Sequence, residues 1–244
     1  MKILALDSSG LVASVALMED DNLIAEYTVQ YKKTHSQTLL PMLEEIARMV
    51  ELDLSSVDAI AVAAGPGSFT GLRIGSATAK GLAFALHKPI VPVPTVDGLA
   101  YQMYGAKDVV CPIMDARRNQ VYTGIYEFLS SRTGLYGYDM NVIREQCAVA
   151  FDEIAAEINK IGRDVIFLGD GVPVFQARMA EALQVPYTIA PAHCSRQSAA
   201  AVAALGRLYY LQGRVESGAE HAPVYLRPSQ AERERAEKER GKLS

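Results

Sequence analysis

The sequence predicts an α/β protein built from two similar lobes. An apolar strand that ends in an aspartate, a polar turn and a second strand occur at residues 3–17, and the same order returns at residues 111–126. The continuous apolar run at residues 59–64 is typical of a strand buried on both faces, and a helical pattern follows it. Strands that alternate with helices form a sheet with helices on its faces. The repeat indicates two such units, although the residues differ and the pattern alone leaves coincidence open.

Composition and charge limit the classes of protein that fit. The chain has 244 residues, of which 50% are hydrophobic, so it can bury the core of one large domain or two small ones. A net charge of −4 argues against non-specific binding to nucleic acid. The three cysteines show no C-x-x-C spacing, and no apolar run reaches the ~18 residues of a membrane span. The apolar run before Asp7 is too short for a signal peptide, so we expect a cytoplasmic protein.

In the first lobe, residues 1–105, hydrophobic periodicity separates strands from helices. Apolar residues recur at helical spacing from Ser36 to about residue 51, with Pro41 just beyond the first turn. Thr95 is placed to cap a short helix that begins near Val96. A further helix is predicted at 72–86, and strands are predicted at 3–6, 12–17, 23–29, 59–64 and 90–93.

The second lobe, residues 106–228, is predicted from similar patterns. Its strands are expected at 111–115, 120–126 and 165–168, and its helices at about 172–183 and 195–211. The last helix, at about 195–212, is a candidate for packing back on the first lobe. The tail at 229–244 alternates acidic and basic residues and is either a solvated helix or disordered.

The stretch GPGSFTGLRIG, residues 65–75, contains four glycines directly after an apolar strand. It fails the P-loop template because no Gly-Lys-[Ser/Thr] closes it, and it fails the dinucleotide template because Thr70 stands where the third glycine is required. Ser68 or Thr70 can instead cap the helix that follows. We interpret the stretch as a turn from strand to helix.

The same helix has one nearly flat side. Gly71, Gly75, Ala79 and Ala83 follow one another at intervals of four residues. A glycine inside a helix costs about 1 kcal/mol relative to alanine, so these glycines predict close packing against a neighbour. Spacing alone favours the sheet of the same lobe over a helix of another chain.

Six motifs occur in order between residue 2 and about residue 227: ILALDSS, THSQTLLPML, GPGSFTGLRIG with Lys80-Gly-Leu82 after it, DARRNQVY, GDG and Pro223-Val-Tyr-Leu-Arg227. Together they resemble the bacterial TsaB family, also called YeaZ. Serine follows Asp7 where the family often has threonine, and Gln120 stands where an acidic residue is common, which puts an acid role there in doubt. The resemblance implies two lobes of the actin-like and sugar-kinase-like ATPase fold, each a ribonuclease-H-like unit.

The resemblance also implies a role in tRNA modification. Such subunits are non-catalytic relatives of TsaD, which places a threonylcarbamoyl group on N6 of adenosine 37 in tRNAs that read codons beginning with A. They pair with TsaD through a face made of helices, in an assembly that the ATPase TsaE engages. They also form homodimers through this partner face, and they reach tRNA through the complex. The residues expected on this partner face are Leu39, Met42, Leu43, Ile46, Met49, Gly71, Leu72, Gly75 and Ala79.

The two aspartate turns support an enzymatic alternative. In actin-like folds the turns after Asp7 and Asp115 would lie near phosphates and magnesium, and Ser8, Ser9 and Gly10 suit that role. Weak binding of ATP or ADP with Mg, or a weak ATPase or small-molecule kinase that uses the cleft between the lobes, is therefore the alternative function. The simpler hypothesis is that each aspartate hydrogen-bonds its own turn.

A glycoprotease-like metallopeptidase is a weaker alternative. The four histidines, His35, His87, His193 and His221, are not clustered at ligand spacing. We therefore expect no metal site, no catalytic residue and no tightly bound cofactor, as suits an accessory subunit.

Overall fold

The computed structural model describes residues 1–31, 35–132 and 134–228. Its strands are β1 Lys2–Asp7, β2 Val12–Glu19, β3 Asn22–Gln30, β4 Ala59–Gly65, β5 Ile90–Pro94, β6 Val109–Asp115, β7 Gln120–Ser130, β8 Tyr138–Ala150, β9 Val165–Leu168 and β10 Tyr187–Ile189. Its helices are α1 His35–Met49, α2 Phe69–Leu86, α3 Thr95–Tyr101, α4 Phe151–Ile161, α5 Val172–Ala182 and α6 Ala199–Leu211, with short 3₁₀ helices at Leu54–Ser56 and Ala192–Cys194.

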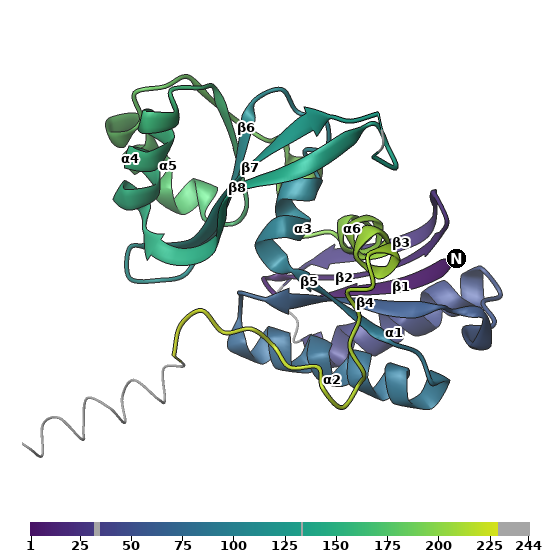
Figure 1. Ribbon diagram of the computed structural model, residues 1–244. Helices are drawn as coiled ribbons and strands as arrows, with labels where there is room; N and C mark the ends of the chain where they lie inside the picture. Colours follow the sequence, from purple (N-terminus) through teal and green to yellow (C-terminus); the bar gives the residue numbers. More distant parts are fainter. Residues whose placement is uncertain (32–34, 133, 229–244) are drawn as a thin grey trace, which may run out of the picture.

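Two five-stranded sheets form the two lobes (Figure 1). The first has the order β3-β2-β1-β4-β5, and the second has the order β8-β7-β6-β9-β10 when it is counted from the corresponding edge. In both sheets the first three strands along the chain pair antiparallel. The fourth strand pairs parallel with the first, and the fifth pairs parallel with the fourth. This repeated topology confirms the predicted α/β fold with two similar lobes.

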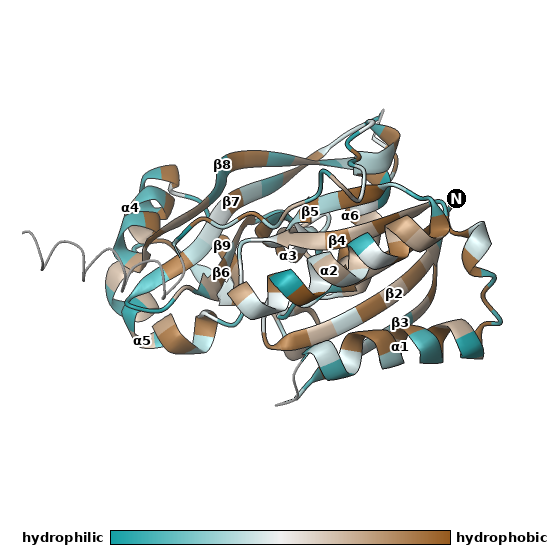
Figure 2. Cartoon of the chain, turned by 90° about the horizontal axis from the view of Figure 1, so that it is seen from below, coloured by the Kyte–Doolittle hydropathy of each residue, from teal (hydrophilic) through white to brown (hydrophobic). Residues whose placement is uncertain are grey.

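Helices cover both faces of the first sheet. Figure 2 shows α1 and α2 on one face, and Figure 1 shows α3 and α6 on the other face, toward the second lobe. Successive side chains of β1 point to opposite faces of the sheet. Leu4 and Leu6 therefore belong to the core beneath α1 and α2, whereas Ile3 and Ala5 belong to the core beneath α3 and α6. In the second lobe, α4 and α5 cover the corresponding outer face.

The chain returns to the first lobe after completing the second. Helix α6 packs on β1, β2, β4 and β5, and residues 214–228, which we call the strap, continue across the same lobe. Glu216 exchanges two backbone hydrogen bonds of 2.8 Å with Ile90, and Val224 N–H donates to the Ala64 carbonyl oxygen (2.7 Å). The first lobe therefore contains residues 1–105 together with α6 and most of the strap.

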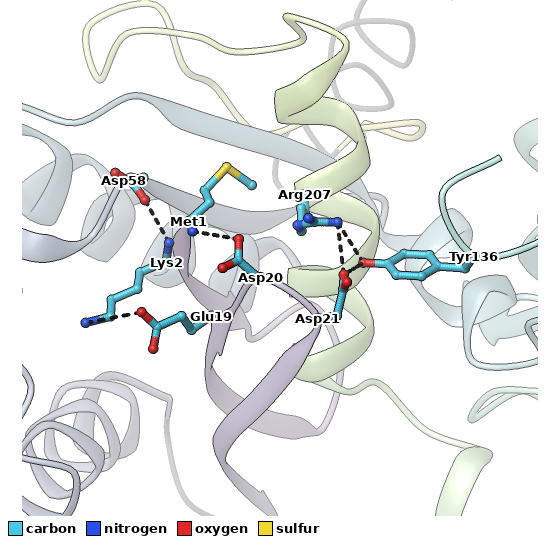
Figure 3. Close-up of polar contacts among 8 residues, drawn as sticks. All are labelled: Met1, Lys2, Glu19, Asp20, Asp21, Asp58, Tyr136 and Arg207. Carbon is cyan, nitrogen blue, oxygen red and sulfur yellow. Dashed lines mark hydrogen bonds and ion pairs between the residues drawn. The ribbon is translucent and has the colours of Figure 1, made fainter. Parts of the chain in front are cut away.

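Polar contacts also join the lobes near the β2–β3 turn (Figure 3). The Tyr136 hydroxyl donates to Asp21 Oδ1 (2.8 Å), and Arg207 Nη1 lies 3.0 Å from the Tyr136 oxygen and 3.1 Å from Asp21 Oδ1. The N-terminal amine pairs with the adjacent Asp20 at 2.8 Å. These contacts hold the loop between β7 and β8 against the first lobe.

Two predicted caps have different outcomes. Ser68 caps α2, because its Oγ accepts a hydrogen bond from Gly71 N–H (3.3 Å). The prediction for Thr95 is wrong: Pro94 occupies the cap position of α3, and Thr95 Oγ1 accepts Gly65 N–H (3.1 Å). Thr95 thus ties two neighbouring strand ends together. Within the described part of the chain, no helix has the length and apolarity needed to cross a membrane.

Candidate functional site

A cleft of about 550 Å³ opens between the two lobes. The turn after β1, the glycine stretch and the start of α2 line one side of it. The turn after β6, Asp170 and the end of the strap line the other side. Asp7 and Asp115 end the corresponding strands β1 and β6, as the repeat predicted.

The first aspartate turn forms hydrogen bonds within itself. Asp7 Oδ1 accepts hydrogen bonds from Ser9 N–H (2.9 Å) and from the Ser9 hydroxyl (2.6 Å). Asp7 is only 2% exposed, and this burial raises its pKa to about 6 against the opposing effect of the Ser9 hydrogen bonds. Ser9 and Gly10 line the cleft, whereas Asp7 and Ser8 do not. The carboxyl group is thus directed into its own turn.

The glycine stretch packs directly on this turn. Ser68 N–H donates to the Ser9 carbonyl oxygen (2.7 Å), and the Ser8 hydroxyl donates to the Gly71 carbonyl oxygen (2.9 Å). A Cβ atom at Gly67 or Gly71 would overlap the backbone carbonyl oxygen of Ser9 or Ser8, respectively. These glycines are therefore needed for the close approach of two backbones.

The flat side of α2 has its neighbour in the same chain. A Cβ atom at Gly75 would lie 2.5 Å from Ser8 Oγ, and Ala79 and Ala83 belong to the core of the first lobe. The packing of the glycines is thus explained without a second chain, as their spacing alone favoured.

The second aspartate turn carries arginines. Asp115 Oδ1 accepts Arg117 N–H (2.7 Å), Asp115 Oδ2 lies 3.0 Å from the Arg117 guanidinium, and Asp115 N–H donates to Asp170 Oδ1 (3.1 Å). Burial raises the pKa of Asp170. Arg117, Arg118 and Asn119 have φ angles of 63°, 56° and 57°, which non-glycine residues seldom adopt. Both aspartates therefore hydrogen-bond their own turns, as the simpler hypothesis held.

Most residues expected on the partner face lie in the core of the first lobe. Those that are buried are Leu39, Met42, Leu43, Ile46, Gly71, Leu72, Gly75 and Ala79. Met49, by contrast, is 67% exposed. The buried side chains stabilise the lobe, so a partner that binds this structure as it stands meets Met49 and other residues of α1 and α2.

A second set of residues on α1 and α2 is exposed. Leu40 and Met49 extend outward from α1, and Phe84, which is 83% exposed, extends outward from α2. Ala77 and Gly81 lie on the exposed side of α2, and a Cβ atom at Gly81 would meet nothing within 4 Å. We call these five residues the helical face. It combines large apolar side chains with a flat section of helix.

The histidines have separate structural surroundings. His35 Nε2 donates to the Gly10 carbonyl oxygen (2.8 Å), and His221 Nδ1 lies 3.0 Å from Glu216 Oε2. Across residues 1–31, 35–132 and 134–228, no group of three or more His, Cys, Asp or Glu side chains is arranged to hold a metal ion.

Comparison with known proteins gives the family. The family model described as "TsaD: tRNA N6-adenosine threonylcarbamoyltransferase" matches residues 22–235. A Bacillus subtilis protein named tRNA threonylcarbamoyladenosine biosynthesis protein TsaB is 33% identical to this chain, over 95% of this chain and 96% of its own length. This chain belongs to the TsaB family.

Further relatives agree with this assignment. A Haemophilus influenzae protein with the same TsaB name is 34% identical over 93% of this chain and 94% of its own. A solved structure described as "YeaZ from Pseudomonas aeruginosa" superimposes with a TM-score of 0.77 at 28% identity, covering 92% of this chain and 99% of that one. The TsaB resemblance of the six motifs is thus confirmed, and it extends over nearly the whole chain and its two-lobed fold.

Proposed function

We propose that this TsaB-family chain is a non-catalytic platform subunit for N6-threonylcarbamoylation of adenosine 37 in tRNAs that read codons beginning with A. It acts in the cytoplasm by binding and organising TsaD, in an assembly that the ATPase TsaE engages. Without TsaD, the same helical face pairs two copies of the chain. The names of the relatives place them in tRNA threonylcarbamoyladenosine biosynthesis, which supports the pathway.

The helical face is the observation that carries this proposal. Phe84 on α2 and Leu40 and Met49 on α1 expose large apolar side chains on two adjacent helices. Large apolar side chains that are exposed on a surface are candidates for contact with another protein. Ala77 and Gly81 leave room between them for a partner helix to approach α2 closely.

The first turn supports a non-catalytic role. A phosphate-binding turn needs free backbone N–H groups directed at the ligand. Here Ser9 N–H donates to Asp7, and Ser68 N–H, at the start of α2, donates to Ser9. Two backbone N–H groups beside the cleft, those of Ser9 and Ser68, are thus already used in hydrogen bonds within the protein.

Arginine substitutions on the helical face test the proposal. Ala77→Arg combined with Gly81→Arg places two long cations on the exposed side of α2, so we expect the chain to stop co-purifying with tagged TsaD. Ala180→Arg, on the exposed side of α5 in the other lobe, is the control and should bind normally. Circular dichroism should show all variants folded. Retained capture of TsaD by the folded double variant would refute this placement.

Nucleotide binding in the cleft is the second candidate function. The cleft is large enough for a small molecule, and Ser9, Gly10 and Ser68 line it. Calorimetry of the isolated chain with Mg-ATP separates the candidates, because a platform predicts weak or no binding and negligible turnover. Tight binding that Asp7→Asn abolishes would favour the kinase or ATPase alternative.

A further inference from the structure

Four arginines from distant parts of the sequence are linked beside the cleft, and two of them, Arg117 and Arg227, line it. Arg73 of α2 donates through Nε to the Tyr225 hydroxyl (3.3 Å). Two residues further along the strap, Arg227 donates to the carbonyl oxygen of Arg117 (3.3 Å), and Arg118 follows in the same turn. We call Arg73, Arg117, Arg118 and Arg227 the arginine strip. Hydrogen bonds made by the strap connect it from α2 to the β6–β7 turn.

The strip is positively charged within an acidic chain. No carboxylate of the described residues forms an ion pair with Arg73, Arg118 or Arg227. Arg117 pairs with Asp115, yet its side chain stays 86% exposed. The strip therefore has several guanidinium groups free to bind an anion.

Nearby carboxylates offset only part of this charge, because Asp115 pairs with one arginine of the four. Asp170, which lines the cleft with Asp115, is largely buried and accepts the Asp115 N–H. Asp152, next to the pocket that contains Asn119, is held by Arg178 through contacts of 2.7 and 2.8 Å. The acidic groups around the β6–β7 turn are thus already hydrogen-bonded or paired.

Two features fix the strip in place. The left-handed backbone at Arg117 and Arg118 is closed by the Asp115 hydrogen bond and braced by Arg227, so both side chains start from a defined turn. At the other end, the Tyr225 ring stacks on Phe69 with centroids 4.4 Å apart and planes 3° apart. Arg73 lies beside this stack, 6.0 Å from the Tyr225 centroid. Cations that alternate with aromatic rings are typical of surfaces that bind single-stranded nucleic acid.

We propose that the arginine strip binds the phosphate backbone of RNA, in a loop or single-stranded segment, at the mouth of the cleft. This inference rests on the proposed function, and it replaces the expectation that tRNA is reached only through the complex. The guanidinium groups follow one another from α2 across the strap to the β6–β7 turn. Such a row can contact successive phosphates of one nucleic-acid strand. Because α2 also carries the helical face, RNA bound to a partner there can continue along the strip.

The test uses the full-length chain and a fluorescein-labelled tRNA anticodon stem-loop in an anisotropy titration at several salt concentrations. The variant Arg73→Ala/Arg117→Ala/Arg118→Ala removes three exposed cations and leaves the bracing Arg227 intact. We expect affinity at low salt to fall on the order of tenfold. The slope of log affinity against log salt should fall by about 2, since each lost phosphate contact contributes ~0.7 for a single strand.

The control variant is Lys107→Ala/Arg132→Ala/Lys160→Ala, which removes the same charge from exposed positions away from the cleft. It should keep the wild-type salt slope. Three results would overturn the proposal: no binding of the RNA by the wild type, an equal loss in both triple variants, or an unchanged slope in the strip variant. Displacement of the RNA by equimolar Mg-ATP would instead assign the strip to free nucleotides.

The same variants separate this inference from the platform function. The strip variant keeps the whole helical face, so it should still capture tagged TsaD. The Ala77→Arg/Gly81→Arg variant keeps the strip, so it should still bind the stem-loop. RNA binding is measured without TsaD, and failure of one proposal therefore leaves the other result interpretable.

Discussion

Three glycines of α2 provide a direct test of how this helix packs. A Cβ atom at Gly81 would meet nothing within 4 Å, one at Gly75 would lie 2.5 Å from Ser8 Oγ, and one at Gly71 would overlap the Ser8 backbone carbonyl oxygen. Alanine substitution should therefore have three different effects in one helix. Helix propensity alone would make all three changes favourable.

The expected magnitudes follow from these neighbours. Gly81→Ala should add about 1 kcal/mol to the free energy of unfolding, because only the helix propensity changes. At Gly75 the Ser8 hydroxyl can rotate away, but it then gives up its buried hydrogen bond to Gly71, worth about 1 kcal/mol, so the net change is near zero. At Gly71 the obstacle is backbone that cannot rotate away, and overpacking should lower the free energy of unfolding by about 1–3 kcal/mol.

Thermal unfolding followed by circular dichroism measures this order. For a chain of this size, 1 kcal/mol corresponds to about 2–4 °C, so the melting temperature should rise by about 2–4 °C in Gly81→Ala and fall by about 2–12 °C in Gly71→Ala. Equal melting temperatures for these two variants would show that α2 does not pack on the first turn as described. Because a larger side chain at Gly75 would disturb Ser8, the interface test uses the exposed positions Ala77 and Gly81 instead.

Two further substitutions test buried carboxyl groups. Asp7→Asn keeps Oδ1 as the acceptor for Ser9 and removes the charge. The pKa of Asp7 is raised from 3.8 to about 6 in the folded state, so the folded chain binds more protons between these values and wild-type stability falls as pH rises through them. Asp7→Asn should be more stable than wild type by about 2–3 kcal/mol at pH 7 and equal to it near pH 4 in urea titrations, and equality at pH 7 would contradict this. Asp97→Ala leaves the buried hydroxyls of Tyr126 and Tyr209 without their acceptor, at 2.7 and 3.0 Å. It should lower the free energy of unfolding by about 2–4 kcal/mol and Asp97→Asn by less, so an unchanged melting temperature in Asp97→Ala would refute the role of this contact.

Buried elements were predictable from the sequence, whereas several exposed ones were not. Strands β1, β4, β6 and β9 have continuous apolar runs because both faces are covered. Strand β8 is exposed or half-buried along its length, and its one apolar run, at residues 147–150, continues directly into Phe151 of α4. Strand β10 has only three residues. Helix α4 did carry a detectable pattern, since Phe151, Ile154, Ala155 and Ile158 follow helical spacing, but it was not among the predicted elements.

The candidate site was harder to predict because it depends on which side of α2 faces the sheet. Gly71, Gly75 and Ala79 form one series at four-residue intervals, and Ala77 and Gly81 belong to a second. Both consist of small residues, and although spacing favoured the sheet as the neighbour of the first series, it gave no reason to single out the second as an exposed surface. The structure buries the first against Ser8 and leaves the second exposed. The arginine strip was equally hidden, because only the return of the strap brings Arg227 beside the β6–β7 turn.

The two aspartate turns show how a duplicated fold can change function without changing topology. Both follow the first strand of the same five-stranded unit, and both aspartates hydrogen-bond their own turns. The first turn is then covered by the glycine stretch, which uses its polar groups, while the second exposes Arg117 and Arg118. The second turn therefore adds an arginine to the wall of the cleft, where Asp115 and Asp170 also lie. Exposed guanidinium groups at the second turn suit the proposed binding of an extended anion, such as an RNA backbone, beside the cleft.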